Sequence, residues 1–314
     1  MKPSFSKSQI LLVMTLFIIV VMALFPFPRD IYSHALRASM NAGHFFGFGI
    51  LAWFIFKVLC RIGRGKYAYF VAAAATLVLV LLIEFIQPWF GRTASWHDVY
   101  LSLLGIATLL CIDYIWQAKN QFHWIKRISS LLGLTIALTV LYPAMIAWYG
   151  VIWHWQQFPQ LGDFENKSEL QFWRPNEVGK NASRIRISND YAKLGEYSLQ
   201  INAGKTRWSG VSYYAENANW SEFEFLSLHI YNPEKTFYLV VRIDDNADTT
   251  YLHDRFNRSY KILPGWQHIR IPLSEIQHSP RNRKMNMHAI RQMILFISSS
   301  QPTRTFYLDN VHLH

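Results

Sequence analysis

The 314-residue chain is poor in cysteine and lacks the motifs of familiar enzymes. Its two cysteines are Cys60 and Cys111, so no disulfide framework holds the C-terminal half together. The HExxH, paired CxxC, P-loop and GxSxG patterns are all missing from the sequence. The sequence therefore gives no support for a zinc protease, a thiol oxidoreductase, a P-loop nucleotide hydrolase or a serine hydrolase of these types.

Acidic residues are scarce in the first half of the chain. Residues 1–152 contain 12 Lys and Arg against 4 Asp and Glu, whereas residues 153–314 contain 19 against 16. A net charge of +11 would suggest a nucleic-acid partner in a soluble protein. Here the surplus flanks long apolar segments, where Lys and Arg set the orientation of membrane helices. We therefore expect a membrane partner and no nucleic acid.

Five apolar runs are long enough to cross a bilayer, which takes about 17 to 25 residues. They cover residues 9–25, 44–60, 67–87, 99–116 and 128–152. The first follows Lys2 and Lys7 as a signal peptide would, but its core is long and no small-residue cleavage site comes after it. The sequence therefore predicts a multi-pass α-helical membrane domain with five transmembrane helices over residues 1–152.

Basic residues mark one side of these spans. That side holds Lys2, Lys7, Lys57, Arg61, Arg64, Lys66, Lys119, Lys126 and Arg127, and the other holds only Arg29, Arg37 and Arg92. The positive-inside rule then predicts a cytoplasmic amino terminus in a bacterial inner membrane. Five crossings leave the C-terminal half, residues 161–314, extracytoplasmic after a linker over residues 153–160.

Polar side chains interrupt the apolar spans at the ends that face outward. They are His44, Glu84, Gln87, Arg92 and Asp98. An ionisable group at membrane depth is costly, so each is a functional candidate by default. Glu84 and Gln87 share one helix face, and Pro88 ends that helix. Binding of a lipid headgroup requires fewer coincidences than acid–base catalysis by His44 or Glu84, so we rank binding first.

Simpler roles stay open for some of these residues. Ser95 and Asp98 match the S-x-x-D capping pattern, and we expect Asp98 to act as a helix cap. Arg92 could hold phosphate headgroups, and His44 could open an interfacial helix. Glu84 resists such explanations, because a carboxylate among aliphatic residues must be neutralised, paired or placed in a polar cavity. We expect Glu84 to line a pocket.

The joint spacing of these residues resembles the VanZ-like family of bacterial membrane proteins. The matching positions over about residues 10–116 are His44, Glu84, Gln87, Gly91, Arg92, Asp98 and Gly105. The family pattern has a small polar residue such as Asn soon after the aspartate, where this chain has Leu101 and Ser102. The resemblance implies a cell-envelope role, linked in one founding case to glycopeptide-antibiotic resistance, with no settled reaction.

After Phe158 the pattern changes to short alternating runs such as RIRISND and FYLVVRIDD, separated by turn signals such as NPEK. These runs predict an all-β sandwich. The order DFEN, WSGV, LPGWQHIRIPL and FYLDNVHL resembles the jelly-roll domains of carbohydrate-binding modules. Those modules share a galactose-binding-like fold with the complex I intermediate-associated proteins. The resemblance implies glycan binding, although one fold can host many functions.

Sugar faces stack on exposed aromatic rings while polar groups select hydroxyls. The candidate sugar contacts are Arg207, Trp208, Tyr213, Tyr214, Tyr251, His253 and Arg255. Trp220 and Trp266 are expected to fill the core of the sandwich instead.

The jelly-roll resemblance also implies a structural calcium ion, and we expect no other cofactor. Its ligands would map to Asp163, Glu165 and Asp309. The acidic run at residues 244–248 is a competing site or simply a solvated turn.

Three functions stay open. The first is an envelope protein whose outward polar cluster binds a lipid headgroup or lipid-linked glycan while its ectodomain binds an envelope polysaccharide. The second is a membrane enzyme that uses Glu84 or His44 on a lipid-linked phosphoester or glycan. The third is a membrane-anchored module that docks a protein partner.

Overall fold

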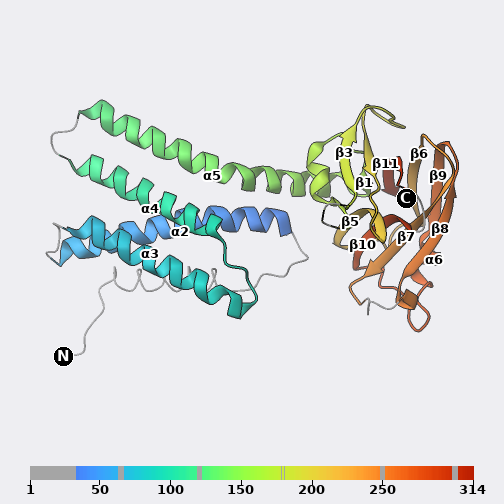
Figure 1. Ribbon diagram of the computed structural model, residues 1–314, viewed down its shortest axis with the longest axis horizontal. Coiled ribbons are helices and arrows are strands. Elements are labelled where there is room, and N and C mark those ends of the chain that lie inside the picture. Colours follow the sequence, from blue (N-terminus) through green and yellow to red (C-terminus); the bar gives the residue numbers. More distant parts are fainter. Residues whose placement is uncertain are drawn as a thin grey trace. The chain divides into compact units, whose positions relative to one another are not determined.

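The computed structural model describes residues 33–62, 67–118, 122–177, 179, 181–247, 252–298 and 303–314 (Figure 1). The described residues form two compact units, Ser33–Ile146 and Ala147–His314. The first predicted span, residues 9–25, lies outside the described residues. The two units are described in turn.

Four long apolar helices begin the described chain. They are α2 (Ser33–Arg61), α3 (Ala68–Ile86), α4 (Trp96–Gln117) and α5 (His123–Gln157). Each is long and apolar enough to cross a membrane. Helices therefore cover the predicted residues 44–60, 67–87, 99–116 and 128–152. The expectation that His44 opens a helix is wrong, because α2 begins at Ser33 and His44 lies within it.

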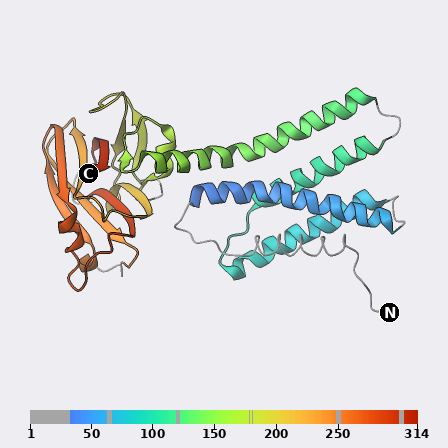
Figure 2. The same cartoon turned by 180° about the vertical axis from the view of Figure 1, so that it is seen from behind.

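Helices α2, α3 and α4 pack against one another (Figures 1 and 2). Two glycines let α2 and α4 approach closely. A Cβ added to Gly105 would lie 2.0 Å from the carbonyl oxygen of Phe45, and one added to Gly49 would lie 2.8 Å from the carbonyl oxygen of Gly105. Small residues at such positions let helix backbones come together.

A single carboxylate joins the three helices at one end. Asp113 on α4 accepts hydrogen bonds from Trp53 Nε1 at 2.8 Å, Lys57 Nζ at 2.6 Å and the Tyr69 hydroxyl at 2.8 Å. Trp53 and Lys57 lie on α2, and Tyr69 lies in the first turn of α3. The charge of Asp113 is therefore compensated by several donors.

The second unit is a β-sandwich of two antiparallel sheets. Its strands are β1 (Gln160–Gly162), β2 (Trp173–Pro175), β3 (Arg184–Ser188), β4 (Ser198–Asn202), β5 (Trp208–Ala218), β6 (Phe225–Asn232), β7 (Phe237–Asp245), β8 (Phe256–Ile262), β9 (Gly265–Pro272), β10 (Ile290–Ser298) and β11 (Thr305–Leu313). The six-stranded sheet has the order β3-β4-β11-β6-β9, with β1 paired to β11, and the five-stranded sheet has the order β2-β5-β10-β7-β8. The predicted all-β sandwich is confirmed.

Short helical segments connect these strands. They are η3 (Lys167–Gln171), η4 (Leu252–Asp254) and α6 (Leu273–Gln277). Trp220 is fully buried in the sandwich core, as predicted. The prediction for Trp266 is wrong, because its ring is half-buried and lies against Tyr231 with ring centres 5.3 Å apart. It pairs in register with Tyr231, whose neighbour Ile230 points into the core, so both rings lie on the outer side of the six-stranded sheet.

The end of α5 belongs to the sandwich unit. The expected linker over residues 153–160 is incorrect for its first part, because α5 continues to Gln157. His154 is buried, stacks on Phe172 at 4.1 Å and hydrogen-bonds the Tyr213 hydroxyl through Nε2 at 2.8 Å. No proline lies between residue 152, where the predicted span ends, and Pro159, and burial of His154 stabilises the last turn of the helix.

Candidate functional site

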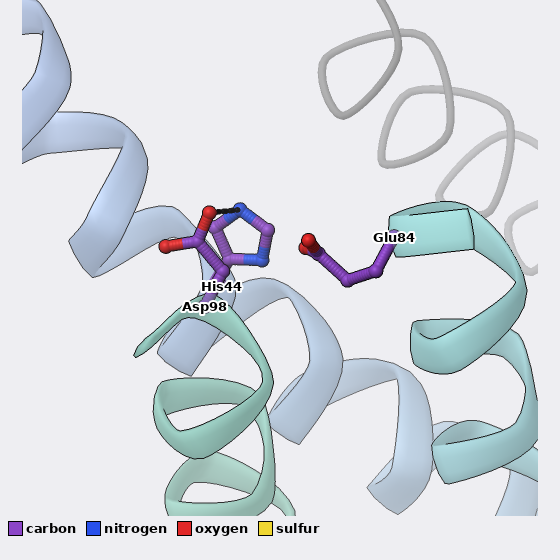
Figure 3. A group of neighbouring side chains, drawn as sticks. All are labelled: His44, Glu84 and Asp98. Atoms are coloured by element: carbon purple, nitrogen blue, oxygen red, sulfur yellow. Dashed lines mark ion pairs between the residues drawn. The ribbon is translucent and has the colours of Figure 1, made fainter. Parts of the chain in front are cut away.

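Three polar side chains from three helices converge at one end of the helical unit (Figure 3). His44 lies on α2, Glu84 near the end of α3 and Asp98 at the start of α4. They are 6%, 6% and 8% exposed. One potential ligand atom from each lies within 4.8 Å of the other two. Helix α3 runs antiparallel to α2 and α4 (Figure 1). The end of α3 and the start of α4 therefore lie together, and residues distant in sequence meet here.

The contacts within this cluster leave some polar atoms without partners. His44 Nε2 lies 3.7 Å from Asp98 Oδ2, and His97 Nδ1 lies 3.7 Å from Asp98 Oδ1. The backbone N–H of Ser95 donates to Glu84 Oε2 at 2.8 Å. Glu84 Oε1 and His44 Nδ1 are buried and make no hydrogen bond. Such atoms are costly unless something else satisfies them.

The capping interpretation of Ser95 and Asp98 is wrong. Ser95 is the N-cap residue of α4, but its side chain makes no capping hydrogen bond. The carboxylate of Asp98 pairs with His44 instead, because α2 brings the imidazole to the start of α4. Ser102, the position that departs from the VanZ-like pattern, donates its hydroxyl to the carbonyl oxygen of Asp98 at 2.8 Å.

Gln87 and Arg92 lie beside the three converging residues. Gln87 is fully buried, caps α3 and begins the 3₁₀ segment η2 (Gln87–Phe90). Gly91, at φ 75°, then turns the chain toward α4. Arg92 is half-buried, and its charge acts on both His44 and Glu84. The predicted polar group is therefore gathered at one end of the helices.

Two of the predicted sugar contacts lie on the outer side of the five-stranded sheet. Trp208 is 47% exposed, and the Arg207 guanidinium lies 5.1 Å from the centre of its ring. Tyr214 is half-buried, and the Arg174 guanidinium lies 5.3 Å from its ring centre. Guanidinium groups stabilise aromatic rings held in this way.

Tyr213 points to the opposite side of the same strand. It is 1% exposed and packs against Trp173 at 5.0 Å between ring centres. Neighbouring residues in a strand face opposite sides of the sheet, so Tyr213 and Tyr214 cannot both face a ligand. The predicted sugar contact at Tyr213 is therefore corrected to a core role.

A polar cluster that the sequence analysis missed occupies the same outer side. Asp244 on β7 accepts two hydrogen bonds from Arg242 Nε and one from Arg242 Nη2, at 2.9 to 3.1 Å. It also accepts one from Gln292 Nε2 at 2.7 Å. Arg291 and Arg255 lie 3.7 and 3.9 Å away. The alternation in FYLVVRIDD already placed Arg242 and Asp244 on one side of a strand.

The register connects this cluster to the predicted residues. Tyr214 pairs with Gln292, and Gln292 pairs with Asp244 across β5, β10 and β7. Arg255, a predicted contact, is buried beside Asp244. His253 is exposed on η4, and Tyr251 lies outside the described residues.

The three predicted calcium ligands hold backbone loops. Asp163 Oδ1 accepts the N–H of Glu165 at 3.2 Å. Glu165 Oε1 accepts two N–H groups, from residues 196 and 197, at 2.9 Å each. Asp309 is fully buried, which raises its pKa, and it accepts three backbone N–H groups. Among the described residues, these three are not grouped like the His44 cluster, and the calcium ion stays a prediction.

A further buried carboxylate, Glu169, was also missed. It forms a capping box with Asn166 at the start of η3, and its other oxygen accepts the N–H groups of Asp163 and Phe164 at 3.1 Å. Burial first, and then the charge of Asp163, raises the pKa of Glu169 to about 8. The N-x-x-E spacing was a readable signal of this cap.

Comparison with known proteins agrees with this fold. Residues 160–314 match the family model described as Carbohydrate binding domain 30. No curated protein matches the chain. The C-terminal sandwich is therefore similar to carbohydrate-binding domains, whereas the VanZ-like resemblance of residues 10–116 stays a prediction.

Three solved structures are also similar to the chain. The Family 11 carbohydrate-binding module from Clostridium thermocellum, in complex with a β-1,3-1,4-mixed-linked tetrasaccharide, is 16% identical, with 49% of this chain and 93% of that chain covered and a TM-score of 0.39. The CBM22-1 xylan-binding domain from Paenibacillus barcinonensis Xyn10C is 16% identical, with 49% and 93% covered and a TM-score of 0.35. An exo-β-agarase is 17% identical, with 49% and 24% covered and a TM-score of 0.40.

Proposed function

We propose that this protein binds an envelope polysaccharide through its sandwich and is anchored in a bacterial inner membrane by its helices. The family match of residues 160–314 carries the glycan part of the proposal. Four described helices of sufficient length and hydropathy support the membrane part. The distribution of basic residues favours an extracytoplasmic sandwich.

The glycan site in this proposal is the outer side of the five-stranded sheet. Trp208 and Tyr214 offer ring faces for stacking on sugars, and the cluster around Asp244 offers polar groups for hydroxyls. Three arginines stand near this one carboxylate: Arg242, Arg255 and Arg291. Since guanidinium groups bind carboxylates well, we favour a polysaccharide that contains uronic acids.

Binding of neutral and uronate-containing polysaccharides to the full-length protein in detergent micelles tests this proposal. Trp208→Ala should weaken binding about 30-fold, because an aromatic anchor at a binding surface is worth about 2 kcal/mol. Trp266→Ala, on the outer side of the other sheet, is the matched control and should change the affinity less than about twofold. Equal losses in both variants, or no saturable binding to any polysaccharide, would contradict the proposal.

A second function belongs to the helical unit. The guanidinium of Arg92, whose charge acts on the buried His44 and Glu84, suits the phosphate of a lipid headgroup or lipid-linked glycan. Acid–base catalysis by Glu84 or His44 on such a lipid is the alternative, and it needs the same substrate in the same place. Binding stays the simpler proposal.

A further inference from the structure

We propose that His44, Glu84 and Asp98 form a binding site for one zinc ion. The inference goes beyond glycan binding and headgroup recognition, because it depends only on the geometry and chemistry of these three side chains. Imidazole nitrogen and carboxylate oxygen are both common zinc ligands. All three residues are more than nine-tenths buried, and in Figure 3 the His44 ring lies between the carboxyl groups of Asp98 and Glu84.

The hydrogen bonds of Glu84 leave one oxygen for a metal ion. Its Oε2 atom is held by the backbone N–H of Ser95, whereas its Oε1 atom is buried without a hydrogen-bond partner. A metal-bound carboxylate is typically oriented in this way, with a second partner on the oxygen that does not bind the metal. His44 Nδ1 is likewise buried without a partner. A cation would compensate the unpaired carboxylate oxygen, and ligation would engage the imidazole.

The distances suit zinc after a small movement of side chains. Ligands about 2.0 to 2.1 Å from a tetrahedral zinc ion lie about 3.3 Å from one another. The potential ligand atoms here lie within 4.8 Å of one another. Rotation about side-chain bonds covers that difference, while the contact between Gly49 and Gly105 keeps α2 and α4 in place. Magnesium and calcium prefer six or more oxygen ligands, which these side chains do not supply.

Charge compensation also separates this cluster from Asp113, a half-buried carboxylate of the helical unit. Asp113 accepts hydrogen bonds from Lys57, Trp53 and Tyr69, so its charge is matched by local donors. Glu84 and Asp98 bring two carboxyl groups together, and the charge of Arg92 acts on Glu84. A divalent ion would neutralise both carboxylates. Three protein ligands would leave one tetrahedral position open for water or a phosphate oxygen.

Zinc binding to the full-length protein, purified in detergent without a histidine tag, tests the site directly. After removal of metal with a chelator and titration with zinc alone, elemental analysis should find one zinc ion per chain. Glu84→Gln and Asp98→Asn should each weaken zinc affinity more than about 100-fold, since loss of a second-shell partner alone costs 10- to 100-fold. Asp113→Asn is the matched control on the same helix as Asp98 and should keep zinc binding.

A second set of variants tests whether a stacked histidine pair on the sandwich binds the zinc instead. His229 and His268 stack at 4.6 Å on the six-stranded sheet, and their replacement by Gln should leave zinc binding unchanged. Zinc should also raise the melting temperature of the wild type and Asp113→Asn but not that of Asp98→Asn, which shows whether each variant is folded. The site is refuted if the wild type binds no stoichiometric zinc, or if binding survives in Glu84→Gln and Asp98→Asn. Glycan binding is measured separately, so either proposal can fail alone.

Discussion

The contact between α2 and α4 makes a specific prediction for Gly105→Ala. The added methyl group would start 2.0 Å from the carbonyl oxygen of Phe45, whereas ordinary contact begins near 3.4 Å. The backbone oxygen cannot rotate away, so the two helices must separate locally by about 1.4 Å. A similar separation at His44 and Asp98 would lengthen their 3.7 Å contact beyond ion-pair range.

Overpacking of this kind costs about 1 to 3 kcal/mol, and a clash with backbone belongs at the upper end of that range. Gly43→Ala is the matched control on α2, because nothing lies within 4 Å of its added Cβ. Alanine is more favourable than glycine in a helix by about 0.5 to 1 kcal/mol, so this control should be neutral or stabilising. The two substitutions add the same methyl group, but the first should lower the free energy of unfolding and the second should leave it unchanged or raise it.

Thermal unfolding of the full-length variants in detergent micelles, followed by size-exclusion chromatography, measures this difference. Gly105→Ala should melt well below the wild type, and Gly43→Ala at or above it. If Gly105→Ala melts as high as Gly43→Ala, the helices are not held together by this glycine contact, and the positioning argument for the cluster fails.

Two other predictions concern the sandwich and its orientation. Because the pKa of Glu169 is higher in the folded state, unfolding releases its proton, and stability should fall by about 5 kcal/mol as the pH rises from about 4.5 to 8. Denaturation at several pH values should show this slope in the wild type and not in Glu169→Gln; equal slopes would refute it. In spheroplasts, an impermeant thiol reagent should label a Glu222→Cys variant while leaving Cys60 and Cys111 unlabelled until the membrane is opened. The reverse pattern would place the sandwich in the cytoplasm.

Helix topology explains why much of the polar cluster was predictable. The rule that successive spans alternate in direction is enough to place His44, Glu84 and Asp98 at one end. The sequence could not show that the carboxylate of Asp98 pairs with His44 rather than capping α4. That choice depends on how closely α2 approaches, which the contact of Gly105 with Phe45 determines.

Strand alternation was less informative about the glycan surface. The run WSGVSYY predicts that Tyr213 and Tyr214 face opposite sides, but not which of them faces the core. The answer depends on partners distant in sequence, since Tyr213 packs against Trp173 and bonds His154. Residues 244–248 were interpreted as a competing calcium site or a solvated turn for the same reason, because β10 brings Gln292 to Asp244 only in the folded sheet.

The last turn of α5 determines where the sandwich can be separated from the helices and joined to another protein. A sandwich excised at residue 160 would lose the imidazole of His154, which fills space against Phe172 and bonds Tyr213. A fusion made at that point would leave a cavity beside Phe172 and remove the hydrogen-bond partner that His154 gives the Tyr213 hydroxyl. The segment that can be transferred intact is therefore longer than residues 160–314, which match the family model, because it includes the last turn of α5.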